Sequence, residues 1–216
     1  MKKALIFYGG WNGHTPKETS ELFRDWLTEA GFAVTMADNL NVLDNYDDIK
    51  DYDLFVPMFT MSEISGQQCG NICRAVAEGA GIAGCHGGMC DSFRNSTDWQ
   101  FMTGAQWVAH PGGIVDYTVE VDPESPFCAG LNGFAVTSEQ YYIHVDPAAT
   151  VHATTTFKLD NGPHYANGEV TVPVVITKMW GKGRVFYNSL GHTWETFSIP
   201  EAKEIMLRGL LWAART

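Results

Sequence analysis

The first half of the sequence alternates short apolar runs with segments of helical periodicity, and this alternation limits the possible folds more than any other feature. The expected elements are strands at residues 3–8, 32–37, 53–57 and 81–85, and helices at residues 16–30 and 67–80. Strands that are separated by helices pair in parallel through right-handed crossovers. The pattern therefore predicts a layered α/β fold that begins with a parallel sheet.

The start of the first helix carries several agreeing signals. Thr15 is a candidate N-cap, Pro16 suits the first helical position, and Glu18 completes a capping box. Gly31 marks the end of this helix.

The second half has a different pattern, with strands that follow one another without long intervening helices. We expect strands at residues 114–121, 134–137, 151–157, 172–180 and 184–189, and a last helix at residues 200–214. The glycine-rich residues 181–183 predict a hairpin between the last two strands. The fold class is therefore α/β, with a mostly parallel sheet, antiparallel additions in the second half, and a single domain over residues 1–216.

The charge balance excludes several classes of partner. The chain has 25 acidic and 14 basic residues, a net charge of -11, and no run rich in lysine or arginine. This predicts no nucleic-acid partner and no anionic membrane surface, whereas a neutral substrate or a cation is compatible. The apolar run after Lys3 stops at Gly9, too early for a signal peptide, so we expect a cytoplasmic protein. Its 45% hydrophobic composition is compatible with a homo-oligomer.

Motifs for common cofactors and nucleophiles do not occur. The sequence has no G-x-G-x-x-G, no G-x-x-x-x-G-K-[ST] and no G-x-S-x-G, so no nucleotide cofactor and no serine nucleophile are predicted. Its five cysteines are expected to be reduced thiols.

Histidines follow several of the expected strands. His14, His86 and His192 each stand beside glycine after a strand, and Glu139 and His144 follow the strand at residues 134–137. Because ligands bind at the carboxyl ends of parallel strands, these side chains predict a common site. They suit a divalent metal, zinc in particular, or proton transfer without a metal. The alternative is that each histidine stabilises its own turn, and His110, in a His-Pro-Gly turn, fits this alternative best.

The surroundings of His86 resemble a nucleophile elbow, with a small residue before it and glycines after it at a strand-to-helix turn. Cys85 is expected to point into the sheet, because side chains alternate along a strand. Cys90 lies close by in sequence, and a thiol enzyme that uses it is a rival hypothesis.

Aromatic residues accompany these positions. Trp11, Tyr141 and Trp194 are candidate sugar contacts, because a sugar ring offers one apolar face and a rim of hydroxyl groups. Hydrophobic packing is the alternative for each of them. Glu195 is a candidate to orient His192.

Longer motifs resemble those of the ThuA-like (trehalose-utilisation) family. They are C-H-G-G-M-C-D-S-F at residues 85–93, W-V-A-H-P-G-G at 107–113, S-E-Q-Y-Y at 138–142 and G-K-G-R-V-F-Y-N-S-L-G-H at 181–192. The resemblance implies a flavodoxin-like layered sheet similar to the class I glutamine amidotransferases, which use an elbow cysteine with a later histidine and glutamate. Here His86 holds the elbow, and His192 and Glu195 lie near the later positions, so glutamine hydrolysis is not expected.

The resemblance also implies a link to trehalose or a related disaccharide. The leading hypothesis is an enzyme that acts on a disaccharide or an oxidised sugar by acid–base chemistry, with His86, His192 and Glu139 as catalytic residues. Zinc or another divalent metal would be held by His86, Glu139, His144 and His192, with His14 as a substrate or metal contact. Isomerisation, hydrolysis and elimination remain open, and the alternative is a non-catalytic sugar-binding or regulatory protein.

Overall fold

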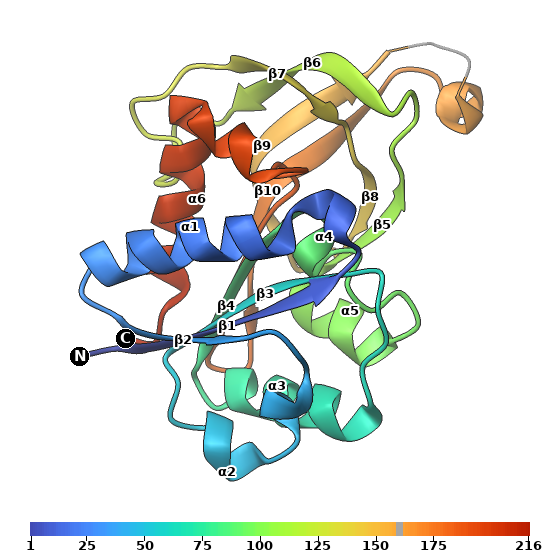
Figure 1. The fold of residues 1–216 in the computed structure, drawn as a ribbon. Helices are drawn as coiled ribbons and strands as arrows, with labels where there is room; N and C mark the ends of the chain where they lie inside the picture. The colour runs from blue at the N-terminus through green and yellow to red at the C-terminus, as the bar shows by residue number, and fades with distance from the viewer. Residues whose placement is uncertain (159–161) are drawn as a thin grey trace.

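The structure, a computed structural model, describes residues 1–158 and 162–216 and is built around one large sheet (Figure 1). Its nine strands run in the order β2-β1-β3-β4-β11-β10-β9-β6-β7. The first five pair in parallel: β2 (Ala33–Ala37), β1 (Lys3–Gly10), β3 (Leu54–Thr60), β4 (Gly81–Cys85) and β11 (Gly183–Asn188). The order of these strands confirms the flavodoxin-like parallel sheet.

The remaining four strands form what we call the antiparallel wing. It consists of β10 (Val170–Trp180), β9 (Thr150–Phe157), β6 (Ile114–Val121) and β7 (Phe134–Glu139). A separate two-stranded sheet pairs β5 (Ala105–Ala109) with β8 (Tyr142–Val145). The antiparallel additions predicted for the second half are therefore confirmed.

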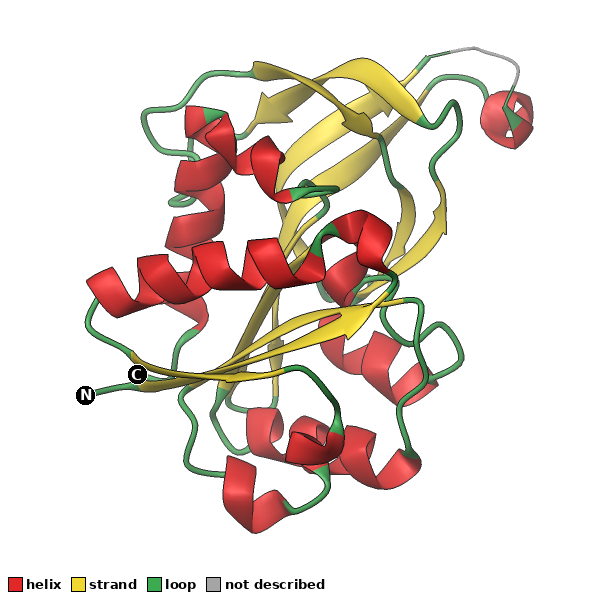
Figure 2. Cartoon of the chain, in the orientation of Figure 1, coloured by secondary structure: helices red, strands yellow, loops and turns green. Residues whose placement is uncertain are grey.

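Helices cover both faces of the parallel sheet (Figure 2). The α-helices are α1 (Pro16–Glu29), α2 (Tyr46–Ile49), α3 (Gly66–Ala77), α4 (His86–Met89), α5 (Thr97–Thr103) and α6 (Pro200–Ala213). Short 3-10 helices are η1 (Asn12–His14), η2 (Asn41–Leu43), η3 (Pro163–Asn167) and η4 (Trp194–Ser198). In Figure 1, α1 and α6 lie on one side of the parallel strands, and α2, α3 and α5 lie on the other.

Strand β1 shows why its sequence is apolar without alternation. Ala4 and Ile6 belong to the core beneath α1 and α6, whereas Leu5 and Phe7 belong to the core beneath α3 and α5. Both faces of a parallel strand are buried in such a fold, so every position favours an apolar residue.

The predicted cap of α1 is wrong. Thr15 has a left-handed backbone with φ of 45° and makes no side-chain capping hydrogen bond, so no capping box with Glu18 forms. Its hydroxyl oxygen instead accepts a hydrogen bond from the Trp194 backbone N–H at 3.0 Å. The start of α1 is thereby joined to the loop that follows β11.

Among the described residues, no helix has the length and apolar character needed to cross a membrane.

Candidate functional site

Three histidines and one glutamate meet at the carboxyl ends of the parallel strands. His14 follows β1, His86 follows β4, and His192 follows β11, while Glu139 is the last residue of β7 in the antiparallel wing. One possible ligand atom from each of the four lies within 4.8 Å of those from the other three. We call these four residues the His/Glu cluster.

The glutamate lies at the centre of this cluster. Its Oε2 atom is 3.2 Å from His192 Nδ1 and 3.6 Å from both His14 Nε2 and His86 Nε2. The other oxygen, Oε1, is 3.8 Å from His110 Nε2. One carboxylate oxygen therefore faces three imidazoles, and the other faces a fourth.

His86 occupies the strand-to-helix elbow that the sequence predicts. Cys85 ends β4 in an extended conformation, and His86 begins α4 with a left-handed φ of 46°. Tyr187 donates its hydroxyl hydrogen to the His86 carbonyl oxygen at 3.3 Å. Left-handed φ values in non-glycine residues are costly and concentrate at functional sites.

Two further non-glycine residues in the described part of the chain, Thr15 and Met61, have left-handed φ values. Thr15 follows His14, and Met61 follows β3, the strand that lies between β1 and β4. The neighbouring strands β1, β3 and β4 are therefore each followed by a residue with a strained backbone. All three residues follow the carboxyl ends of these strands, where the cluster lies.

His14 is held by neighbours that the sequence analysis did not identify. Its Nδ1 atom lies 3.1 Å from Thr60 Oγ1, so that Nε2 is left to face Glu139. Gly87 leaves room for the ring, because a Cβ atom there would lie 2.6 Å from both Cε1 and Nδ1 of His14. Thr60 ends β3, so its position in the strand order was the signal that could have revealed it.

The cluster is buried and its polar atoms are poorly satisfied. His14, His86 and Glu139 are each less than a tenth exposed. Both ring nitrogens of His86, Nδ1 of His192 and Oε2 of Glu139 have no aligned hydrogen-bond partner among the described residues. Buried polar atoms usually have partners, so these four atoms could bind a ligand that supplies the partners they lack.

Burial and charge act in opposite directions on the central carboxylate. Burial alone would raise the pKa of Glu139, but the imidazoles of His14, His192 and His86 outweigh it and hold that pKa well below its usual range. Burial, followed by the neighbouring His14, lowers the pKa of His86 well below its usual value. The arrangement therefore favours a carboxylate facing a neutral imidazole, the protonation states in which both groups bind metals.

Three aromatic residues predicted as sugar contacts surround the cluster, but in different ways. Trp11 is 48% exposed and its ring centroid lies 4.8 Å from that of His14. Trp194 is 40% exposed, two residues beyond His192. Tyr141 is buried, with its ring centroid 3.8 Å from that of His86. The two tryptophans offer open surfaces, whereas Tyr141 supports the His86 imidazole.

His144 does not join the other predicted ligands. It lies in β8 opposite Gln106 of β5, and its side chain is exposed while that of its neighbour Ile143 is buried. Alternation along β8 therefore directs His144 outward, and the structure does not bring it together with the other predicted ligands. His110, which sequence reasoning placed in a structural turn, approaches the cluster instead. Glu195 is exposed in η4.

The cysteines near the elbow are buried thiols. Cys85 Sγ lies 3.8 Å from Met58 Sδ, inside the core as the strand alternation predicts. Burial raises the pKa of the Cys90 thiol to about 12. A thiol that stays protonated near neutral pH is a weak nucleophile.

Comparisons with known proteins agree with this architecture. A ThuA-like protein from Parabacteroides merdae has a TM-score of 0.74 at 17% identity, over 98% of this chain and 89% of its own. A cytoplasmic protein from Salmonella typhimurium has a TM-score of 0.64 at 14% identity, over 100% of both chains. A β-galactosidase from Bacillus circulans sp. alkalophilus has a TM-score of 0.61 at 13% identity, over 98% of this chain and 30% of its own.

At these identities the solved structures are similar to this chain in fold alone. No curated protein sequence matches the chain. The family model described as "Trehalose utilisation" matches residues 3–213, which is nearly the whole sequence. The chain therefore belongs to the ThuA, or trehalose-utilisation, family.

Proposed function

We propose that this chain is a sugar-metabolising enzyme that holds a divalent metal ion, zinc in the first instance, in the His/Glu cluster. Its substrate would be a disaccharide of the trehalose type or an oxidised form of one, converted by acid–base chemistry. The observation that carries the proposal is the convergence of three imidazoles and one carboxylate, with unsatisfied buried atoms facing one another. Membership of the trehalose-utilisation family supports a role in sugar metabolism.

The donor set fits a zinc ion. Zinc–ligand distances of about 2.0–2.2 Å in a tetrahedral site place the ligand atoms about 3.3 Å from one another. The distances of 3.2 Å and 3.6 Å from Glu139 Oε2 to the three imidazole nitrogens are close to this value. The contact between His14 Nδ1 and Thr60 matches the outer hydrogen bond that fixes the tautomer of a metal-binding histidine.

A metal ion in this position would polarise a substrate oxygen or lower the pKa of a bound water. The residues of the chain would supply the rest. Trp11 offers exposed aromatic surface beside His14 for the apolar face of a sugar ring, and the exposed Trp194 follows His192 by two residues. His110 lies beside Glu139 Oε1 and would hold that carboxylate in place. Isomerisation, hydrolysis and elimination on a sugar are all compatible with this set.

Glutamine hydrolysis through a thioester is not part of the proposal, because His86 stands at the elbow where those enzymes have cysteine. We propose a cytoplasmic location, as for the Salmonella neighbour described as a cytoplasmic protein. The net charge of -11 fits a neutral sugar better than a phosphorylated one.

The test combines metal content with turnover. Purified wild-type protein would be reconstituted with zinc, and its metal content measured by mass spectrometry beside the variants His86→Ala, His192→Ala and Glu139→Gln. His144→Ala is the matched control, since it removes an exposed histidine outside the cluster. Turnover of trehalose and of its keto derivatives would be measured on the same samples.

We expect about one metal per chain in the wild type and in His144→Ala, and loss of both metal and turnover in His86→Ala and His192→Ala. A wild-type protein that binds no divalent metal would overturn the metal assignment. Stoichiometric metal and sugar affinity without any turnover would favour a sugar-binding or regulatory protein instead.

A further inference from the structure

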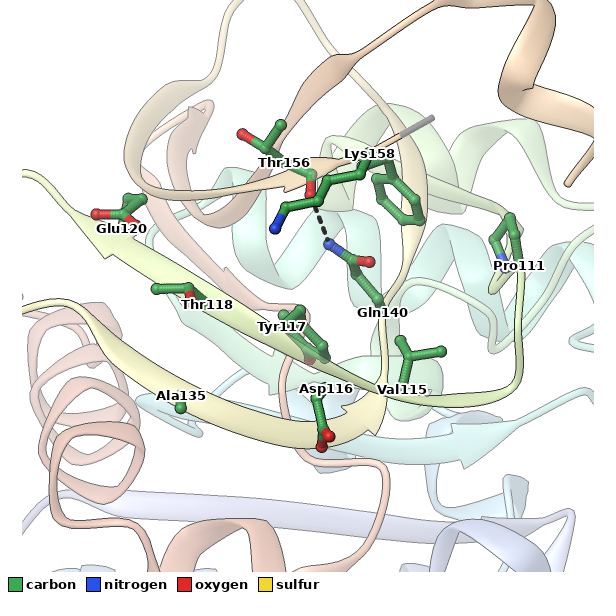
Figure 3. A pocket seen from close by; sticks show the side chains of 11 residues that line it. Pro111, Val115, Asp116, Tyr117, Thr118, Glu120, Ala135, Gln140, Thr156 and Lys158 are labelled. Atoms are coloured by element: carbon green, nitrogen blue, oxygen red, sulfur yellow. Dashed lines mark hydrogen bonds between the residues drawn. The ribbon is translucent and has the colours of Figure 1, made fainter. Parts of the chain in front are cut away.

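A second polar cavity lies in the antiparallel wing. Strands β6 and β9 pair only at Glu120 with Thr154 and at Val121 with Ala153. A cavity of about 610 Å³ is lined by residues of β6 as far as Glu120, by Gln140, and by residues at the end of β9 and just after it (Figure 3). Its volume lies within the range of small-molecule sites, about 300–1,000 Å³.

Gln140 is built into the wall of this cavity. Its side chain is 6% exposed, and its Nε2 donates hydrogen bonds to Thr155 Oγ1 at 2.8 Å and to the Thr156 carbonyl oxygen at 3.3 Å. Thr155 in turn donates to the Thr118 carbonyl oxygen at 2.9 Å. No hydrogen bond from a described residue reaches the Gln140 side-chain oxygen, and Figure 3 shows this oxygen directed into the cavity.

Because no described side chain donates to this oxygen, its donor has to come from a ligand or from water in the cavity. The amide nitrogen is already used to hold β9, so the side chain is fixed in one orientation. Gln140 therefore presents a preset acceptor to whatever enters the cavity.

The rest of the lining indicates the chemical class of the ligand. Thr118 adds a hydroxyl group, Lys158 adds one positive charge against the two carboxylates of Asp116 and Glu120, and Val115 adds an apolar surface. Single donors and acceptors set between apolar patches suit a neutral polyhydroxylated molecule, which offers hydroxyl groups around apolar ring faces. With one lysine among these residues, the cavity has no cluster of cations for a phosphate.

The cavity is separate from the His/Glu cluster but shares a segment with it. Glu139 contributes to the cluster, while its neighbour Gln140 contributes to the cavity. Tyr117, which also lines the cavity, donates its hydroxyl hydrogen to the Glu139 carbonyl oxygen at 3.3 Å. A molecule that contacts Gln140 would therefore contact the segment that positions the central carboxylate.

We propose that this cavity is a second carbohydrate site, which binds a neutral mono- or disaccharide through the side-chain oxygen of Gln140 and the hydroxyl group of Thr118. The inference rests on the proposed function only for the choice of a sugar as ligand class. Its residues are distinct from the four of the cluster, so the two sites can be tested independently.

The experiment is a titration of the full chain with trehalose, in which methyl NMR shifts are measured at each sugar concentration. The methyl groups of Val115, Thr118 and Thr156 report on the cavity, because all three residues line it. Thr118→Trp fills the cavity from an exposed position on β6. Thr150→Trp is the matched control, since it places the same side chain at an exposed threonine at the other end of β9. His192→Ala disables the cluster.

We expect saturable shifts of the cavity methyl groups in the wild type, in Thr150→Trp and in His192→Ala, and loss of the Val115 and Thr156 shifts in Thr118→Trp. Absence of cavity shifts at millimolar trehalose in the wild type, or their loss in His192→Ala, would overturn the second site. Metal content and turnover decide the proposed function separately, because Thr118→Trp leaves all four cluster residues in place.

Discussion

Replacing Gly87 with alanine tests the position of His14 without changing any proposed ligand. A Cβ atom at residue 87 would lie 2.6 Å from Cε1 and Nδ1 of His14 and 2.9 Å from Thr60 Cγ2. Carbon atoms in ordinary contact are about 3.5 Å apart, so the His14 ring must retreat by about 1 Å. The same shift disturbs the hydrogen bond between His14 and Thr60.

The magnitude follows from the tolerance of metal sites. Ligand distances in such sites hold to within about 0.2 Å, so a retreat of about 1 Å removes His14 Nε2 from bonding range. We expect zinc affinity to fall by at least the factor of about 10–100 that a disturbed ligand orientation costs, which is about 1.4–2.8 kcal/mol. Competition with a chromogenic zinc chelator measures the affinity, and thermal unfolding measures the overpacking cost of about 1–3 kcal/mol.

Gly88→Ala is the control, because it adds the same methyl group one residue away. Its Cβ atom would lie 2.9 Å from Met58 Cα and 3.0 Å from Met58 Cε, away from the histidines. This variant should lose stability while keeping its zinc affinity. If Gly87→Ala also bound zinc as tightly as the wild type, the placement of His14 as a ligand would be refuted.

Three further outcomes follow from named contacts. His110→Ala should weaken zinc binding about tenfold in the chelator assay, because it removes the imidazole beside Glu139 Oε1; unchanged affinity would show that His110 does not hold that carboxylate. Asp146→Asn should lower the free energy of unfolding by about 1–3 kcal/mol at pH 7, because the buried Lys178 loses its carboxylate partner at 3.0 Å. The Ala148 backbone N–H and Lys178 hold the pKa of Asp146 below its usual range. The stabilisation by Asp146 is therefore present above the ordinary aspartate pKa and is lost as the pH falls through the lowered value. Urea unfolding midpoints of the variant and the wild type that stayed equally far apart in acid would contradict this. Cys90→Ala should retain turnover, because burial raises the pKa of this thiol to about 12; a loss of turnover at unchanged stability would restore the thiol hypothesis.

The sequence predicted the bounds of secondary-structure elements best for strands that are buried on both faces, because such strands have a continuous run of apolar residues. Strands β1 and β4 and helix α6 lie within a few residues of their predicted bounds. The sequence analysis missed α2, α5, β5 and β8 and the 3-10 helices, all of which are short and lie in stretches without clear periodicity. Thr15 failed as a cap because tertiary contacts with the loop after β11 set its backbone conformation.

Within the candidate site, position in the parallel sheet predicted more than proximity in sequence. His14, His86 and His192 follow strands whose carboxyl ends lie along one edge, and the structure brings them together. His144 is close to Glu139 in sequence, but it belongs to β8, where the alternation of side chains directs it outward. The approach of His110 depends on how the β5–β6 connection folds back, which no local pattern encodes.

The four members of the His/Glu cluster come from four separate stretches of the chain, three from the parallel strands and one from the antiparallel wing. The last of them follows β11, which must insert between β4 and β10 before its loop can reach the others. A nascent, truncated or cleaved chain that lacks this strand has only part of the donor set. Such fragments would lack His192, so the proposed metal centre can be completed only after this late strand has joined the sheet.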